Sequence, residues 1–171
     1  MADVAELFGG PPAVDQNGNL TIWAVKTPLA SLAAPKVTEL GGATAFRITY
    51  SFVSGGWVLT MPQSKNADPR LLAPVVKESL GVLTPALAEL KYVDSAAAGS
   101  AAVVLTEGLW DFVERRNIDQ KVVATVGQPV RAMRLNLGPQ VPGPTDGAGK
   151  FSLTQAVAIE SITVAPVLLV A

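Results

Sequence analysis

Apolar and polar residues alternate along several parts of the chain, and this pattern predicts a protein built mostly of β-strands. Between Val130 and Leu137, the side chains of Met133, Leu135 and Leu137 alternate with small or polar ones. Because successive side chains leave opposite faces of a strand, such a segment buries one face and exposes the other. Eight further segments show this alternation or a run of β-branched and aromatic residues: Leu20–Lys26, Ala43–Val53, Trp57–Met61, Leu83–Val93, Leu109–Arg116, Lys121–Val126, Phe151–Ile159 and Ile162–Val170. Several are short, so the pattern predicts six to nine strands.

Two segments depart from the strand pattern and are candidates for short helices. Leu71–Leu80 has a proline near its first turn and a glycine past its end, which is typical of a short helix. In the Ala-rich segment after Val93, Asp94 or Ser95 can cap a helix over Ala96–Leu105, with a flexible linker as the alternative. Strands and helices do not alternate regularly as in a Rossmann fold. The sequence therefore predicts an all-β sandwich or barrel with one or two short flanking helices.

Turn-forming residues divide the chain into an N-terminal arm and one β-sandwich domain. Residues 1–19 contain two turn-forming sequences, Gly-Gly-Pro-Pro and Asn-Gly-Asn. We therefore predict an N-terminal arm there, with a disordered leader as the alternative. Polar loops are expected over Ser64–Arg70 and Gly138–Gly149, and a turn over Asn117–Gln120. The remaining residues 20–171 have a length that suits one domain with its own core.

The chain has few charged residues for its size. Only 16% of its residues are charged, below the usual quarter, while 49% are apolar. Some uncharged surface is therefore expected to contact other subunits. The net charge of −1 argues against a protein that binds duplex DNA, because such a protein needs a large excess of Lys and Arg. No uninterrupted apolar run is long enough to cross a bilayer, so no membrane span is predicted.

The chain contains no cysteine and no histidine, which excludes several kinds of chemistry. Disulfides, zinc sites built on Cys or His, and Ser-His-Asp or Cys-His triads are impossible. Asp111 and Glu114 are an odd number of residues apart on a predicted strand, so they should leave opposite faces and not act as an acid–base pair. We expect them to be solvated or interface charges. No catalytic residue, cofactor-binding residue, cofactor or metal ligand is predicted.

Two sets of residues are candidates for binding. The basic set consists of Arg115, Arg116, Arg131 and Arg134. Because two arginines at a strand end suit bidentate pairing with carboxylates, we predict salt bridges between subunits for this set, with contacts to a phosphate backbone as the alternative. The aromatic set consists of Trp23, Trp57 and Trp110. We expect these tryptophans to be core or interface anchors, with an aromatic binding platform as the alternative.

Four segments, taken in order, carry a family resemblance. They are NLTIWAVKTPLASLAAPKVTELGGATAFRITY, SKNADPRLLAP, the Ala-rich segment that leads through Gly108 into LWDFVERRNI, and GKFSLTQAVAIESITVAPVLLV. The first contains A-P-x-x-x-E-L before a Gly-containing stretch, and the last contains a closing F-x-x-x-Q strand pair. In this order and spacing they resemble the major tail (tail-tube) proteins of long-tailed phages of actinobacteria, from about Leu20 to Val170. Pro74–Val93 departs from the family pattern, because it is helix-like where a strand is expected.

The resemblance implies a tail-tube fold and a structural role in the virion. Six copies would form a ring, and rings would stack into a hollow tube around a tape-measure protein, later carrying DNA into the host. The N-terminal arm, the long loops and the C-terminal strand would contact neighbouring rings. Tail terminator and tip proteins would be further partners, DNA would pass the lumen transiently and without specificity, and assembly would take place in the host cytoplasm. The absence of a large excess of Lys and Arg agrees with such a lumen.

Other functions remain open on the sequence alone. One is another ring component of the same build, such as a tail terminator or the tube protein of a contractile injection system. A second is a β-sandwich carbohydrate-binding or adhesin module, which should show exposed aromatic side chains on one face. An enzyme is least supported, because the remaining polar residues do not form any catalytic motif.

Overall fold

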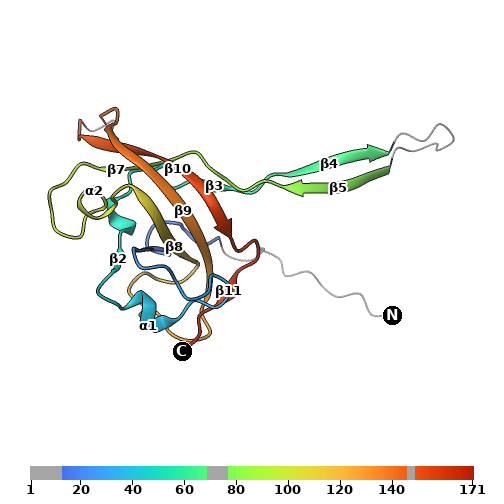
Figure 1. Ribbon diagram of the computed structural model, residues 1–171, viewed down its shortest axis with the longest axis horizontal. Coiled ribbons are helices and arrows are strands. Elements are labelled where there is room, and N and C mark those ends of the chain that lie inside the picture. Colours follow the sequence, from blue (N-terminus) through green and yellow to red (C-terminus); the bar gives the residue numbers. More distant parts are fainter. Residues whose placement is uncertain (1–12, 69–76, 146–148) are drawn as a thin grey trace.

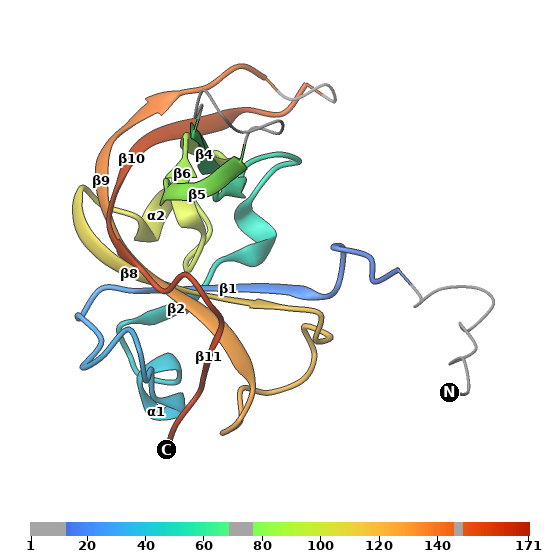
Figure 2. The same cartoon turned by 90° about the vertical axis from the view of Figure 1, so that its right-hand side faces the viewer.

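One curled antiparallel sheet dominates the molecule (Figure 1, Figure 2). The computed structural model describes residues 13–68, 77–145 and 149–171. The strands of the main sheet run in the order β2-β1-β8-β9-β10-β7, and β11 pairs with the start of β9. Their bounds are β1 Leu20–Val25, β2 Ala45–Arg47, β7 Glu89–Val93, β8 Gly108–Arg116, β9 Pro129–Pro142, β10 Ser152–Ile162 and β11 Val167–Leu168. The predicted all-β fold class is confirmed.

The central strands are buried on both faces of the sheet. In β1, Ile22 and Ala24 face one core, while Trp23 and Val25 face another. Strands covered on both sides read as continuous apolar runs, which is why the sequence around Ile22 does not alternate. The first core consists of Ile22, Ala24, Ile48, Trp57, Leu87, Leu90, Tyr92, Ala101, Leu105, Trp110, Phe112, Met133, Leu135 and Leu137. The second consists of Trp23, Val25, Leu29, Leu40, Val113, Val130, Ala132 and Leu169.

Different short elements cover the two faces of the sheet (Figure 2). On one side lie helix α2 (Ala101–Val104), the 3-10 turn η1 (Thr49–Ser51) and the small sheet of β3 (Leu59–Thr60) with β6 (Ala86–Leu87). On the other side lie α1 (Val37–Leu40) and the C-terminal segment with β11. Each helix has four residues. Each helix therefore covers only a small part of one sheet face, and the helices do not form a separate layer.

A two-stranded hairpin projects from the body of the molecule (Figure 1). It pairs β4 (Gln63–Asp68) with β5 (Lys77–Leu83), and these strands pair with no other strand in the described residues. A polar loop over Ser64–Arg70 and a helix over Leu71–Leu80 were predicted here, and both predictions are wrong where the structure describes them. Cross-strand hydrogen bonding overrides the loop composition of β4, since polar residues are tolerated on a hairpin solvated on both faces. Residues 69–76 lie outside the described residues.

Three other predicted elements are shorter than expected. Within Ala43–Val53, β2 ends at Arg47 because the chain turns into η1, where the Thr49 side chain accepts a hydrogen bond from the backbone N–H of Ile22. The helix predicted over Ala96–Leu105 is limited to α2, since Gly99 has a positive φ that interrupts it. The strand predicted over Ile162–Val170 is limited at its end to β11.

Two further predictions fail for one reason. Lys121–Val126 forms no strand, and the segment between β8 and β9 is an irregular loop. Gly138–Pro142, predicted as part of a loop, instead extends β9 because β10 pairs with it as far as Pro142. In both cases the deciding factor is whether a partner strand is available, which local composition does not reveal. Residues 146–148 of that loop lie outside the described residues.

The strands predicted over Leu20–Lys26, Leu109–Arg116, Val130–Leu137 and Phe151–Ile159 are confirmed. The described residues contain eleven strands, more than the six to nine predicted, and three of these have only two residues. Of the predicted N-terminal arm, residues 1–12 lie outside the described residues, and its boundary stays a prediction. No helix in the described part of the chain is long and apolar enough to cross a membrane.

Candidate functional site

One face of β8 and β9 carries an ion pair between buried Asp111 and partly exposed Arg134. These residues are cross-strand partners, and the Arg134 guanidinium donates two hydrogen bonds to the Asp111 carboxylate, at 2.7 and 2.8 Å. Asp111 also accepts a 2.7 Å hydrogen bond from the backbone N–H of Leu29. The hydrogen bonds from Arg134 to Asp111 and the attraction between the two charges raise the Arg134 pKa. The pair therefore ties the segment after β1 onto the sheet.

The other face carries a second carboxylate, Glu114, which is also buried. Its Oε1 atom accepts hydrogen bonds from Trp57 Nε1 at 3.1 Å and from Arg116 Nε at 2.8 Å. Arg131 Nη1 lies 3.8 Å from Glu114 Oε2. Asp111 and Glu114 thus leave opposite faces, as predicted, but the expectation that they are solvated or interface charges is wrong. Both are buried because arginines on the same or adjacent strands neutralise them inside the protomer.

Arg115 has an environment of its own, since its side chain is 0% exposed. Its guanidinium donates hydrogen bonds to Gln128 Oε1 at 2.8 Å and to the carbonyl oxygen of Val122 at 2.8 Å. It also donates to the carbonyl oxygen of Asp119 at 3.2 Å and to the hydroxyl of Thr21 at 3.3 Å. Three of these four contacts are made with the loop between β8 and β9. Arg115 therefore holds that loop from inside.

Burial disfavours the charged form of the Arg115 guanidinium. No carboxylate within the described residues pairs with it, and its guanidinium lies 5.2 Å from the ring centroid of Trp23. Burial lowers the Arg115 pKa, nearby Arg47 lowers it further, and Asp119 opposes the change. Hydrogen bonds from neutral acceptors and the aromatic ring must offset the desolvation cost of the cation.

The four arginines predicted as interface residues therefore differ in their access to solvent. Arg115 is enclosed in the protomer, whereas the Arg116 side chain is 53% exposed. Arg131 and Arg134 are partly exposed, and like Arg116 each lies within ion-pair distance of a carboxylate of the same chain. Partner contacts of these arginines stay a prediction, for which Arg115 is the least accessible. The period of two along β8 is the signal that separates Arg115 from Arg116.

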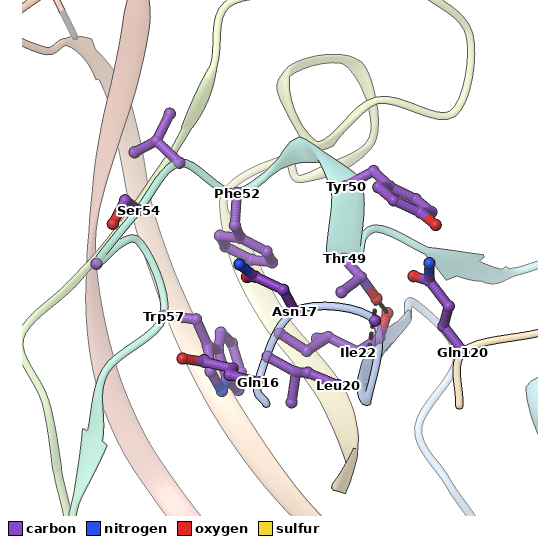
Figure 3. A pocket seen from close by; sticks show the side chains of 13 residues that line it. Gln16, Asn17, Leu20, Ile22, Thr49, Tyr50, Phe52, Ser54, Trp57 and Gln120 are labelled. Atoms are coloured by element: carbon purple, nitrogen blue, oxygen red, sulfur yellow. Dashed lines mark hydrogen bonds between the residues drawn. The ribbon is translucent and has the colours of Figure 1, made fainter. Parts of the chain in front are cut away.

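A hollow lies where the start of β1, η1 and the segment from Phe52 to Trp57 meet (Figure 3). It has a volume of about 490 Å³ and an apolar floor that includes Phe52 and Trp57. Its rim carries the polar side chains of Gln16, Asn17, Ser54, Tyr50 and Gln120, as Figure 3 shows. Of the described residues that line it, none has a carboxylate or an amine. The hollow can receive an apolar group with amide hydrogen bonds at its edge, but it offers no charged acid–base pair.

The aromatic residues follow the core prediction. Trp23, Trp57 and Trp110 are all buried, so the prediction that they are core anchors is confirmed. Among large aromatic side chains of the described residues, Tyr50 and Phe151 are exposed, and they belong to different parts of the fold. No cluster of three potential metal ligands occurs in the described residues.

The projecting hairpin carries two exposed aliphatic side chains and an ion pair on one and the same face. Leu80 and Val82 leave the same face of β5 and are 71% and 74% exposed. Gly81 lies on the opposite face, where it packs against Ser64 of β4. Lys65 and Glu78 form a 3.1 Å ion pair across the hairpin. Sequence reasoning missed this surface because it assigned β5 to a helix, although Leu80-Gly81-Val82 alternates as a strand does.

Comparison with known protein families gives a match that covers most of the chain. A family model described as phage tail tube protein matches residues 10–170, which is nearly the whole chain. No curated protein matches the sequence.

Proposed function

The chain belongs to the phage tail tube protein family, and from this we propose that it is the protomer of stacked rings that form the conduit for DNA ejection. It is a structural component of the phage tail. Each ring contains six copies, and the stack encloses a tape-measure protein before DNA passes. Terminator and tip proteins close the two ends, and the tail is assembled in the host cytoplasm. This role requires self-assembly and no catalytic group.

The observation that carries the proposal is the projecting hairpin. Leu80 and Val82 are exposed on an arm that is itself remote from both cores. Exposed aliphatic pairs on a projecting strand invite association with another chain, so a protein that stays a monomer normally avoids them. A contact between this arm and a different surface of the next copy is heterologous, and repeated heterologous contacts build rings or filaments.

The charge distribution supports passage of DNA through the assembly. Arg116, Arg131 and Arg134 are each within ion-pair distance of a carboxylate of their own protomer, and the net charge of the chain is −1. Arginines already engaged with carboxylates are poor counterions for phosphate, and a lumen with few free cations holds DNA weakly. The DNA is therefore expected to move through without specific contacts.

The direct test is electron microscopy of the purified chain, with a variant of the hairpin. We expect the wild-type protein to form hollow tubes of stacked rings, in which image averaging gives the number of copies in a ring. Leu80→Ser with Val82→Ser should prevent stacking while the melting temperature stays close to that of the wild type, because neither side chain belongs to a core. Val103→Ser is the matched control, since Val103 is an exposed valine on α2.

Two results would contradict the proposal. A wild-type chain that stays monomeric at high concentration would rule out a tube protomer. A single closed ring that never stacks would instead indicate a tail terminator.

A further inference from the structure

Five exposed aliphatic side chains come from two neighbouring segments of the chain. They belong to the loop between β8 and β9 and to the segment around β11: Val122, Val123, Val126, Val164 and Leu168. We call this group the loop patch. Figure 1 and Figure 2 both show this loop beside β11. Apolar groups gathered in this way on a surface mark a contact with another molecule.

Backbone hydrogen bonds hold the two parts of the loop patch together. The N–H of Gly127 donates to the carbonyl oxygen of Leu169 at 2.9 Å, and the N–H of Leu169 donates to the carbonyl oxygen of Gln128 at 3.0 Å. Leu168 is also the cross-strand partner of Pro129. Val126 and Leu168 therefore lie on neighbouring, mutually hydrogen-bonded stretches of chain.

Arg115 fixes the shape of the loop from below. It donates hydrogen bonds to the carbonyl oxygens of Asp119 and Val122. Gln128, which accepts a hydrogen bond from Arg115, donates one to the carbonyl oxygen of Val123 at 3.1 Å. A buried cation without a carboxylate partner is a costly way to hold a loop. The loop nevertheless presents Val123 to solvent, with 76% of the side chain exposed. A fixed loop that displays valines is suited to receive a partner without losing much conformational entropy on binding.

From these observations we infer that the loop patch is the surface on which a second copy of the chain seats Leu80 and Val82 of its hairpin. The inference rests on the proposed function, which makes a second copy the natural partner. The hairpin and the loop patch lie in opposite halves of the molecule (Figure 1, Figure 2). The hairpin of one copy can therefore contact the loop patch of the next copy. Both surfaces expose aliphatic side chains that belong to neither core. A contact between two different surfaces of this kind propagates instead of closing as a dimer.

Cysteine cross-linking tests the pairing directly, because the natural chain has no cysteine. Two single variants, Val82→Cys and Val123→Cys, are mixed in equal amounts, one with an affinity tag, and oxidised. A disulfide forms only when the two Cα atoms approach within about 7 Å. We expect a mixed disulfide between positions 82 and 123 to form several-fold faster than either homodimer. Val103→Cys replaces Val123→Cys in the control mixture and should give no mixed product.

A charge substitution gives an independent readout. Val123→Asp should raise the protein concentration needed for tube assembly by at least about tenfold, because a carboxylate would be buried in an aliphatic contact. Val103→Asp, at an exposed valine outside the patch, should leave that concentration unchanged. Circular dichroism and melting temperature confirm that both variants fold.

The outcomes separate this inference from the proposed function. If the wild type forms tubes, Val123→Asp forms them equally well and positions 82 and 123 do not cross-link, then the loop patch is not the acceptor, while the tube function stands. Preferential cross-linking of position 123 to itself would also overturn the pairing. A wild-type chain that never assembles overturns the proposed function and this inference with it.

Discussion

At the scale of single residues, the side of β8 from which a side chain leaves decides what that residue does. Arg115 and Arg116 are adjacent in sequence, yet one is enclosed among neutral acceptors and the other is half in solvent on the opposite face. The prediction from sequence gave Arg115 and Arg116 the same role, in salt bridges between subunits. A strict reading of the two-residue period would have separated the pair, whereas the carbonyl oxygens that bind Arg115 come from an irregular loop that no local pattern predicts.

Replacing Arg115 should therefore affect folding before it affects assembly. Arg115→Met keeps the bulk of the side chain but leaves the carbonyl oxygens of Asp119 and Val122 without their donor. We expect a loss of about 2–4 kcal/mol in the free energy of unfolding, measured by urea denaturation. Lys121→Met, at an exposed position of the same loop, is the control and should stay within about 0.5 kcal/mol of the wild type. Equal stability of the two variants would show that the buried guanidinium does not hold the loop.

Tyr92 should make the protein sensitive to alkaline pH. Burial raises the pKa of Tyr92 to about 12, with a smaller opposing effect from Gln140. The unfolded chain releases this proton near the ordinary value of 10, so between about pH 10 and 12 the folded state binds more protons and stability falls as pH rises. The loss attributable to this group approaches roughly 2–3 kcal/mol.

The variant Tyr92→Phe tests this effect. It loses the hydrogen bond to Gln155 and should be less stable than the wild type near neutral pH. Because it has no phenol to ionise at this position, its stability should fall less steeply above pH 10, and the gap between the two proteins should narrow. Tyr50→Phe, at an exposed tyrosine, serves as the control. A gap that stays constant up to pH 12 would contradict the assignment.

At the scale of elements, prediction succeeded where a segment's own pattern determines its structure. β8, β9 and β10 are long, and the alternation of Met133, Leu135 and Leu137 located β9 correctly. Prediction failed where a distant partner decides. β2 is three residues long because it pairs only with part of β1, and β5 is a strand because β4 lies beside it. Lys121–Val126 was assigned to a strand for the same reason, since valine runs favour strands but here no neighbouring strand is available.

The junction between β7 and the segment before β3 depends on one glycine. A Cβ at Gly56 would overlap the carbonyl oxygen of Lys91, which belongs to the backbone of β7 and cannot move aside. Gly56→Ala should therefore lower the free energy of unfolding by more than about 2 kcal/mol in thermal or chemical denaturation. Gly42→Ala is the matched control, because the nearest atom to a Cβ there lies at an ordinary 3.5 Å. Similar stabilities for both variants would mean that the junction can open without cost.

At the scale of the whole molecule, two carboxylates of β8 are buried while several aliphatic side chains are exposed. Asp111 and Glu114 are buried and paired with partly exposed arginines, while the hairpin and the loop patch expose leucine and valine. Contacts between such protomers should be governed by removal of apolar surface from water rather than by ion pairs. This differs from the salt bridges between subunits that the arginine-rich strand ends predicted.

The response of assembly to salt distinguishes these two kinds of interface. Raising sodium chloride from about 0.1 to 0.5 M should change the concentration needed for tube assembly little, because screening acts on charges. Sodium sulfate at the same ionic strength should lower that concentration, since excluded salts favour apolar burial. Light scattering measures both. Tubes that dissolve in sodium chloride would instead favour ionic contacts of Arg116, Arg131 and Arg134.

The pairing of β1 with β8 also has a consequence for how the protein is made. Leu20 lies opposite Arg116, so β1 has no partner on that edge until the ribosome has translated residues far beyond it. The hairpin of β4 and β5 pairs locally and emerges earlier. The hairpin is thus translated before the loop proposed to bind it. A nascent chain therefore has no completed loop patch for neighbouring chains on the same messenger RNA to bind. Polymerisation is thereby postponed until after synthesis.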